Sequence, residues 1–340
     1  MIKPYRVRAI NKLCHGFSLF FLVGGLLGGC ASLPDTSGYT AASIQVKEAV
    51  GTSGDVVQAE LASAIKAGAT TANVESVQIL KAAWAATMNS MDAMVAYAQS
   101  IEQIVDAGNK GAESARQVGD SVKKLVDAVK VDATTGASAK LVQLSTDTVA
   151  FVYGEYAKYI AAKSMEEALA KFGPSMVKIS ALVKAQVVDA RMLFFEQIEA
   201  QVQQLDADDE SGYGVWIKKK TELNEKQKTA TSQLLALIPL HSSSDPAKAN
   251  DVKTTLAQLE IANRQIAPYL DEYNEKLKAI RQREKMGISI LGAAENAVAE
   301  WGVAYQQLAQ AVKERKPVNV DSLVAAVAEV RTLSQRWREL

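Results

Sequence analysis

The chain is poor in the side chains that carry most enzyme chemistry. Its 340 residues include only two cysteines and two histidines, and Cys14, His15 and Cys30 all lie in the first 30 positions. From residue 31 onward, no disulfide, thiolate nucleophile or cysteine-bound zinc is possible. His241 is the one remaining histidine, and no Gly-x-Ser-x-Gly motif surrounds the serines beside it. We therefore expect a protein that is not an enzyme.

Cofactor and metal motifs are also missing. The sequence has no phosphate-binding loop, no dinucleotide-binding pattern and no Glu-x-x-His pair of a di-iron bundle. The acidic run at 206–210 resembles a calcium loop, but Ser211 and Ile217 occupy the positions that require Gly and Glu. We predict no cofactor and no metal, and we interpret the acidic run as a solvated turn.

The charge of the chain is balanced. Its first 29 residues hold four of the 38 basic residues and none of the 38 acidic ones, so the remainder carries a net charge of −4. A mildly acidic body without a basic patch offers nothing to attract phosphate backbones. We therefore predict no nucleic-acid partner.

The first 29 residues have the organisation of a secretory signal peptide. Residues 1–16 carry four basic side chains and no acid, and residues 17–27 read FSLFFLVGGLL. A membrane-spanning helix needs about 20 apolar residues, so this run is too short to span a bilayer. The run ends at Leu27, Gly28, Gly29 and Cys30.

The sequence LGGC at 27–30 resembles the lipobox of bacterial lipoproteins. In that family, signal peptidase II recognises the three residues before the cysteine, cuts there, and leaves the cysteine carrying fatty acyl chains such as palmitate. The resemblance implies removal of residues 1–29, lipidation of Cys30 and attachment to a membrane through acyl chains. Two or three chains hold a protein stably, whereas one chain binds only reversibly. An uncleaved signal anchor with a chance cysteine is the alternative.

The residue after the cysteine implies a location. In Gram-negative members of the family, Asp at this position marks retention in the inner membrane, so Ala31 implies the outer membrane. In a Gram-positive cell, the same anchor would lie on the outer face of the single membrane. On either reading, we expect a lipid-anchored protein of the cell envelope.

Three segments follow from this organisation. Residues 31–42 read ASLPDTSGYTAA and are rich in small and turn-forming residues, which predicts a flexible tether. We divide the chain into a signal peptide at 1–29, a lipidated cysteine with its tether at 30–43, and a helical domain at 44–340.

Helical periodicity dominates the domain, and strand patterns are nearly absent. The predicted helices cover residues 55–67, 72–107, 111–131, 138–172, 174–205, 216–238, 246–280, 288–312 and 320–340. Gly173 and Pro174 are expected to separate two of them, since Gly favours the position after a helix and Pro the first turn of the next. Because long helices with short connections form bundles, we predict an all-α, elongated antiparallel bundle with coiled-coil-like packing.

The clearest heptad pattern runs from Val252 to Ile280, with steps of four and three residues. Pro268 should kink this helix. Asn263 interrupts the apolar positions, and two interpretations stay open. As a buried polar residue, Asn263 would specify register or oligomeric state, whereas on a kinked helix it would simply face solvent.

Two faces could bind a partner or pack in the bundle core. The first comprises Trp84, Met88, Met91 and Met94, and the second comprises Tyr153, Tyr156 and Tyr159. Methionine-rich faces can adapt to different ligands, but at helical spacing they also form ordinary cores. Tyrosines likewise pack with their hydroxyl groups at the surface or line a ligand site.

The anchor, the heptads and the missing catalytic groups together predict a non-enzymatic interaction or scaffold protein. It would bind a protein partner or assemble with itself. One alternative is a membrane-active bundle similar to α-helical pore-forming proteins, although its most apolar body segment, residues 286–294, is too short to span a bilayer. The other is a sensory bundle that binds a ligand through one of the two faces.

Overall fold

The structure is a computed structural model of the chain. It describes residues 33–66, 71–108, 110–131, 137–159, 161–207, 212–237 and 246–340. The predicted signal peptide and the lipobox residues Leu27, Gly28, Gly29 and Cys30 lie outside the described residues. His241 also lies outside them, as does most of the acidic run.

Every regular element in the described residues is an α-helix, which confirms the predicted all-α fold. In chain order the helices are α1 (Ser37–Lys66), α2 (Thr71–Asp106), α3 (Ala112–Ala128), α4 (Ala139–Tyr159), α5 (Met165–Ala207), α6 (Gly212–Leu237), α7 (Pro246–Glu314) and α8 (Asp321–Trp337).

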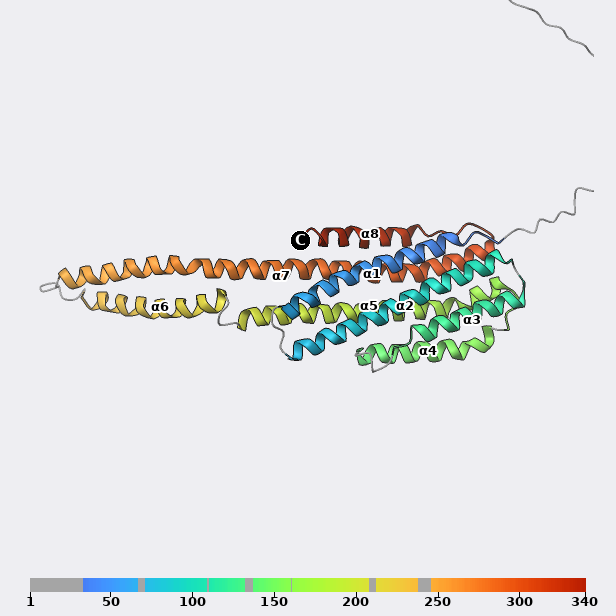
Figure 1. The fold of residues 1–340 in the computed structure, drawn as a ribbon, viewed down its shortest axis with the longest axis horizontal. Coiled ribbons are helices and arrows are strands. Elements are labelled where there is room, and N and C mark those ends of the chain that lie inside the picture. Colours follow the sequence, from blue (N-terminus) through green and yellow to red (C-terminus); the bar gives the residue numbers. More distant parts are fainter. Residues whose placement is uncertain are drawn as a thin grey trace, which may run out of the picture. The chain divides into compact units, whose positions relative to one another are not determined.

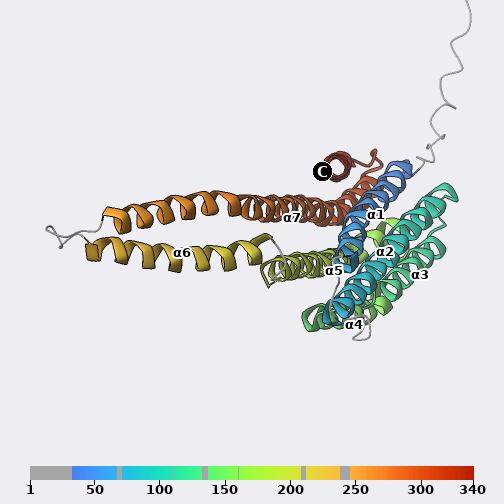
Figure 2. The same cartoon turned by 60° about the vertical axis from the view of Figure 1, so that its left-hand side comes forward.

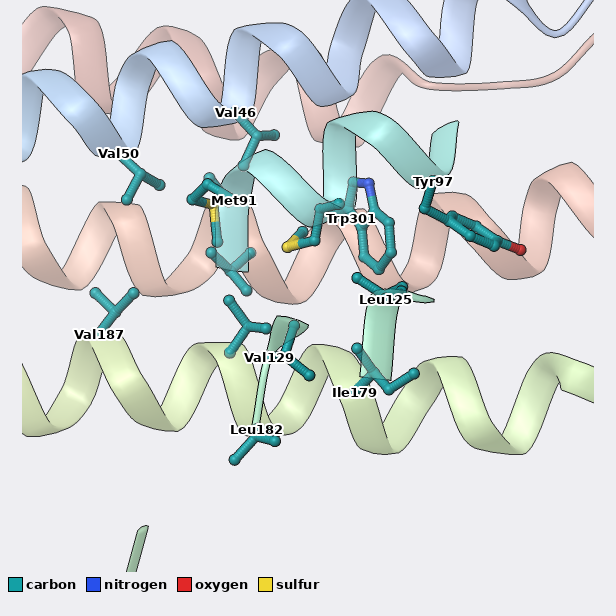
Figure 3. Close-up of a cluster of buried hydrophobic side chains, with 14 of the residues drawn as sticks. Val46, Val50, Met91, Tyr97, Leu125, Val129, Ile179, Leu182, Val187 and Trp301 are labelled. Carbon is teal, nitrogen blue, oxygen red and sulfur yellow. The ribbon is translucent and has the colours of Figure 1, made fainter. Parts of the chain in front are cut away.

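The helices pack as a bundle around α5 and the C-terminal half of α7. Helices α1 and α8 pack on α7, α2 packs on α1 and α5, and α3 and α4 pack on each other and on α5 (Figures 1 and 2). Val46, Met91, Leu125, Ile179 and Trp301 come from five different helices and belong to one buried cluster (Figure 3). One continuous core therefore joins all the helices except α6.

An aromatic group at the centre of this core joins α1, α2 and α7. The Trp301 ring lies 5.9 Å from the Tyr39 ring and 6.3 Å from the Tyr97 ring, and all three are buried. The Trp301 indole Nε1 donates a hydrogen bond to Ser43 Oγ at 2.9 Å. Burial raises the pKa of both tyrosines far above the ordinary value, so these hydroxyl groups stay neutral.

The predicted tether is too long, because α1 begins at Ser37. Tyr39 and Ala42 are buried, and Leu33 packs against the core. The Asp35 carboxylate accepts a hydrogen bond from the Ser37 backbone N–H at 2.8 Å, as a capping residue does. The turn-forming residues that predicted a tether instead form the start of a helix, and the domain begins near residue 33 rather than 44.

The predicted start of the first helix at residue 55 is also wrong, because α1 passes through Gly51 and Gly54 without a break. A Cβ atom at Gly54 would overlap the Trp84 indole. The glycine therefore allows α1 and α2 to approach closely, rather than ending a helix.

Gly173 and Pro174 do not separate two helices. Helix α5 continues through both, since α4 ends at Tyr159 and α5 begins at Met165. Ser164 and Glu167 form a capping arrangement there: Ser164 Oγ accepts from the Glu167 N–H at 3.2 Å, and the Glu167 carboxylate accepts from the Lys163 N–H at 2.8 Å. This cap determines where α5 starts, and the packed helix accommodates the proline.

The two helices predicted at 246–280 and 288–312 are one helix. Helix α7 contains 69 residues, which at 1.5 Å each extend about 100 Å along the axis. Gly287 lies just before the predicted start at residue 288 and is buried against Phe194, and a Cβ atom at this position would overlap that ring. The remaining helices begin and end within a few residues of their predicted bounds.

Candidate functional site

The methionine face lies largely inside the core. Met91 and Met94 are 1% and 2% exposed, and Trp84 is also buried. Trp84 and the half-buried Met88 line a pocket of about 270 Å³ between α1 and α2. Ligand sites usually occupy 300–1,000 Å³, so this pocket is small for one. Packing accounts for Met91 and Met94, and a binding role for the other two residues stays a prediction.

The three tyrosines of α4 attach this helix to its neighbours. Tyr159 is buried, and its ring centroid lies 4.1 Å from that of Phe172 on α5. Tyr156 donates a hydrogen bond to Asp120 of α3 at 2.8 Å, and Tyr153 donates to Asp127 of α3. Their hydroxyl groups are therefore used in contacts between helices.

One buried acidic side chain joins α5 to α7. The Glu295 carboxylate pairs with Arg191 Nε at 2.6 Å. Burial raises the pKa of Glu295, and the charge of Arg191 opposes that shift. Within the described ranges, no three His, Cys, Asp or Glu side chains gather as a metal site would require.

Helix α6 and the N-terminal half of α7 form a hairpin of two helices, which we call the α6–α7 hairpin (Figures 1 and 2). Ala230, Leu259 and Ile266 are buried in the seam between the two helices, but none belongs to the main core cluster. Leu223, Leu256 and several other seam residues stay half-buried. In a pair of helices, each helix covers only one stripe of the other's surface. A third helix could therefore still pack on this seam.

A polar pair interrupts the seam. Lys220 Nζ donates to Asn263 Oδ1 at 2.8 Å, and Asn263 Nδ2 donates to the Leu259 carbonyl at 3.0 Å. Asn263 therefore lies half-buried in the seam, opposite a lysine of the partner helix, and does not simply face solvent. A polar pair at one level of an apolar seam favours the register in which the two residues meet.

Replacing Asn263 with alanine should loosen α6 without affecting the bundle. The Lys220 ammonium would lose its acceptor beside an apolar seam, which costs about 1 kcal/mol, or roughly a fivefold faster local opening. Hydrogen–deuterium exchange of the α6 amides measures this, with Gln265→Ala on the exposed side as the control. Unchanged exchange in α6 would contradict a role for the pair.

The base of the hairpin is held by an aromatic cluster. Gly212 begins α6 so close to α7 that a Cβ atom would overlap the Tyr269 carbonyl. The Tyr213 ring lies 4.7 Å from the Tyr273 ring, and the Tyr273 hydroxyl donates to Asp206 Oδ1 at 2.6 Å. That hydrogen bond raises the pKa of Tyr273 to about 12. Tyr269 and Tyr273 are spaced one helical turn apart, but this spacing alone did not predict the cluster.

The outer surface of the hairpin exposes large apolar side chains. Leu235 is 58% exposed and Ile261 is 55% exposed. Among the large apolar side chains of the described residues, only the C-terminal Leu340 is more exposed. Near the start of α7, Val252 and Ala236 line a pocket of about 360 Å³. These groups can pack against another protein surface.

None of the helices in the described residues is long and apolar enough to cross a bilayer. Comparison with protein-family models, with curated proteins and with solved structures finds no match to this chain. These comparisons indicate no functional site, so the choice of a candidate depends on the geometry of this chain alone. That geometry makes the α6–α7 hairpin the main candidate for an interaction surface.

Proposed function

We propose that this chain is a lipid-anchored, non-enzymatic interaction protein of the cell envelope. Its bundle carries the α6–α7 hairpin, which binds a protein partner or a second copy of the chain. One observation supports this proposal most: the hairpin stands apart from the main core and covers only part of its own apolar seam. An additional helix packed there would bury the half-exposed seam residues.

The anchor and the hairpin have complementary roles in this proposal. The lipobox at 27–30 supplies attachment to the membrane, and acyl chains confine the protein to a surface. Confinement raises the effective concentration of the hairpin for partners at the same membrane, so a weak helical interface is sufficient for binding. No catalytic group is needed for this role.

Site-specific photocrosslinking in cells tests the proposal. A photoreactive amino acid at the half-buried seam residue Leu223 or Leu256 should give reproducible adducts of defined mass, since an additional helix on the seam would cover both positions. The matched control is Val324 on α8, which is 42% exposed on the bundle. Adducts of twice the chain mass would indicate self-assembly, and other masses would identify a different partner.

The outcome that contradicts the proposal is equally specific. If both hairpin positions give only monomer with no reproducible neighbour, while the Val324 control reacts, the hairpin is not the interaction surface. If Cys30 of the mature chain carries no acyl group, the proposed lipid anchor is wrong.

A further inference from the structure

The connection between the predicted lipid anchor and the folded domain is very short. Leu33 already packs against the core, and only two residues lie between it and Cys30. Three residue steps extend at most about 10 Å. An acylated Cys30 would therefore hold the end of the bundle at which α1 begins close to the bilayer.

Three turns between helices lie at this same end, and they connect α2 to α3, α4 to α5 and α7 to α8 (Figure 1). Two close contacts support this placement. Gly38 at the start of α1 is adjacent to Val320 before α8, because a Cβ atom on Gly38 would lie 4.0 Å from Val320 Cγ2. A Cβ atom on Gly111 would lie 3.4 Å from the Lys163 carbonyl oxygen.

These turns present four exposed cations, namely Lys110, Lys163, Arg315 and Lys316. Residues 107–111, 160–164 and 315–320 contain no acidic side chain. The backbone of each turn is held in place: the Lys110 N–H donates to Ser114 Oγ at 3.1 Å, and the Lys316 N–H donates to the Ala311 carbonyl at 3.0 Å. The Lys163 N–H donates to the Glu167 carboxylate, as described above.

Apart from the exposed Asp106 in the last turn of α2, the acidic side chains beside these turns have local partners or lie in first helical turns. Asp35 accepts from the start of α1, Glu167 pairs with Lys171 at 2.7 Å, and Glu314 pairs with Lys316 at 2.9 Å. Further acids occupy first helical turns, where the positive end of the helix dipole favours them: Glu113 in α3, Glu166 in α5 and Asp321 in α8.

Arg315 has an unusual backbone conformation for its residue type. Its φ of +56° makes it the only non-glycine residue with positive φ in the described part of the chain. It follows the last turn of α7 at the position where glycine is usually found. A strained residue that presents a charge is a reason to look for a function that needs the charge.

We propose that this end of the bundle is a lipid-docking surface, in which Lys110, Lys163, Arg315 and Lys316 contact the anionic headgroups of the bilayer that holds Cys30. Helix α7 runs from this surface to the tip of the α6–α7 hairpin, so the tip is directed away from that bilayer. This inference rests on the proposed lipid anchor. Each cation near an anionic surface strengthens binding by roughly fivefold at low salt.

Fluorescent probes on the acylated protein test the orientation. The chain has no cysteine after Cys30, so Ala161→Cys in the α4–α5 turn and Ala247→Cys near the start of α7 each introduce one labelling site. In vesicles that contain headgroup-level quenchers, the probe at 161 should be strongly quenched and the probe at 247 unaffected. Equal quenching at both sites, or stronger quenching at 247, would overturn the inference.

The contribution of the four cations is tested by charge neutralisation in the mature Cys30→Ser chain, which lacks acyl groups. Lys110→Gln, Lys163→Gln, Lys316→Gln and Arg315→Gly together should reduce binding to phosphatidylglycerol-containing vesicles at least tenfold at low salt. The matched control removes four exposed lysines of the hairpin instead, at 226, 228, 248 and 253, and should leave binding unchanged. Equal losses in the two variants would show only non-specific attraction.

Arg315→Gly alone separates the docking role from a structural one. Glycine relieves the positive φ, so the thermal stability should rise while vesicle binding falls several-fold. Unchanged vesicle binding would contradict a role for Arg315. Failure of the lipid anchor is recognised independently, because the mass of the mature chain would then show an unmodified Cys30. An acylated chain whose 161 probe is not quenched would refute the docking surface alone.

Discussion

Trp301→Ala is expected to destabilise the bundle by about 3–5 kcal/mol, a large part of the stability of a typical domain. The Trp301 side chain is fully buried, and its ring contacts Tyr39 and Tyr97 from two other helices. The substitution removes these contacts, leaves a cavity, and deprives Ser43 Oγ of its indole donor. Urea unfolding followed by circular dichroism measures the loss.

Two further variants divide this effect into its causes. Trp301→Phe keeps most of the aromatic volume and removes the hydrogen bond, so we expect a smaller loss of about 1–3 kcal/mol. Val303→Ala alters a half-exposed side chain two residues away on α7 and should change stability by less than about 1 kcal/mol. A loss below about 1 kcal/mol for Trp301→Ala would mean that this aromatic group does not organise the core.

Cys30→Ser should remove the protein from the membrane fraction almost completely, or stall its processing as a precursor. Acyl chains contribute about 0.8 kcal/mol for each buried methylene, so their loss outweighs any effect of a single surface charge. The bundle should remain folded, because Cys30 lies before Leu33, the first described residue that packs against the core. Cell fractionation and the mass of the mature chain measure the outcome.

Cys14→Ser is the matched control, since Cys14 lies in the predicted leader and should be absent from the mature protein. Fractions should be washed at high salt, which screens residual attraction between the basic turns and anionic lipid. If the Cys30→Ser chain stays in the membrane fraction with unchanged mass, residues 1–29 are an uncleaved signal anchor instead.

The helices that could be predicted from sequence are those whose ends coincide with strong local signals. Helix α2 ends before a glycine-rich turn, and α7 begins at Pro246 in the first-turn position that proline favours. The heptad positions around Asn263 also predict which face of α7 meets α6. Local backbone preference and helical periodicity are sufficient in these cases, because they depend on neighbours within a few residues.

The incorrect boundaries arose where glycine or proline has a tertiary role. Gly54 and Gly287 directly precede the predicted helix starts at residues 55 and 288, whereas in the fold they accommodate the Trp84 and Phe194 rings of adjacent helices. Pro174 lies inside α5, because the capping arrangement at Ser164 starts that helix upstream. In a sequence pattern, a glycine that ends a helix looks the same as a glycine that allows another helix to approach.

By itself, the sequence determined that this protein is helical, that residues 31–340 contain no cysteine and a single histidine, and that Cys30 is the residue predicted to carry lipid. The tertiary structure decided which apolar stripes are covered. Met91 and Met94 are buried because several helices surround them, while the stripe of the α6–α7 hairpin has only one partner helix. The structure also gathered the basic turns at one end, since antiparallel helices bring distant turns together. Periodicity records that a residue is apolar or charged, but burial and proximity depend on which helices pack beside it.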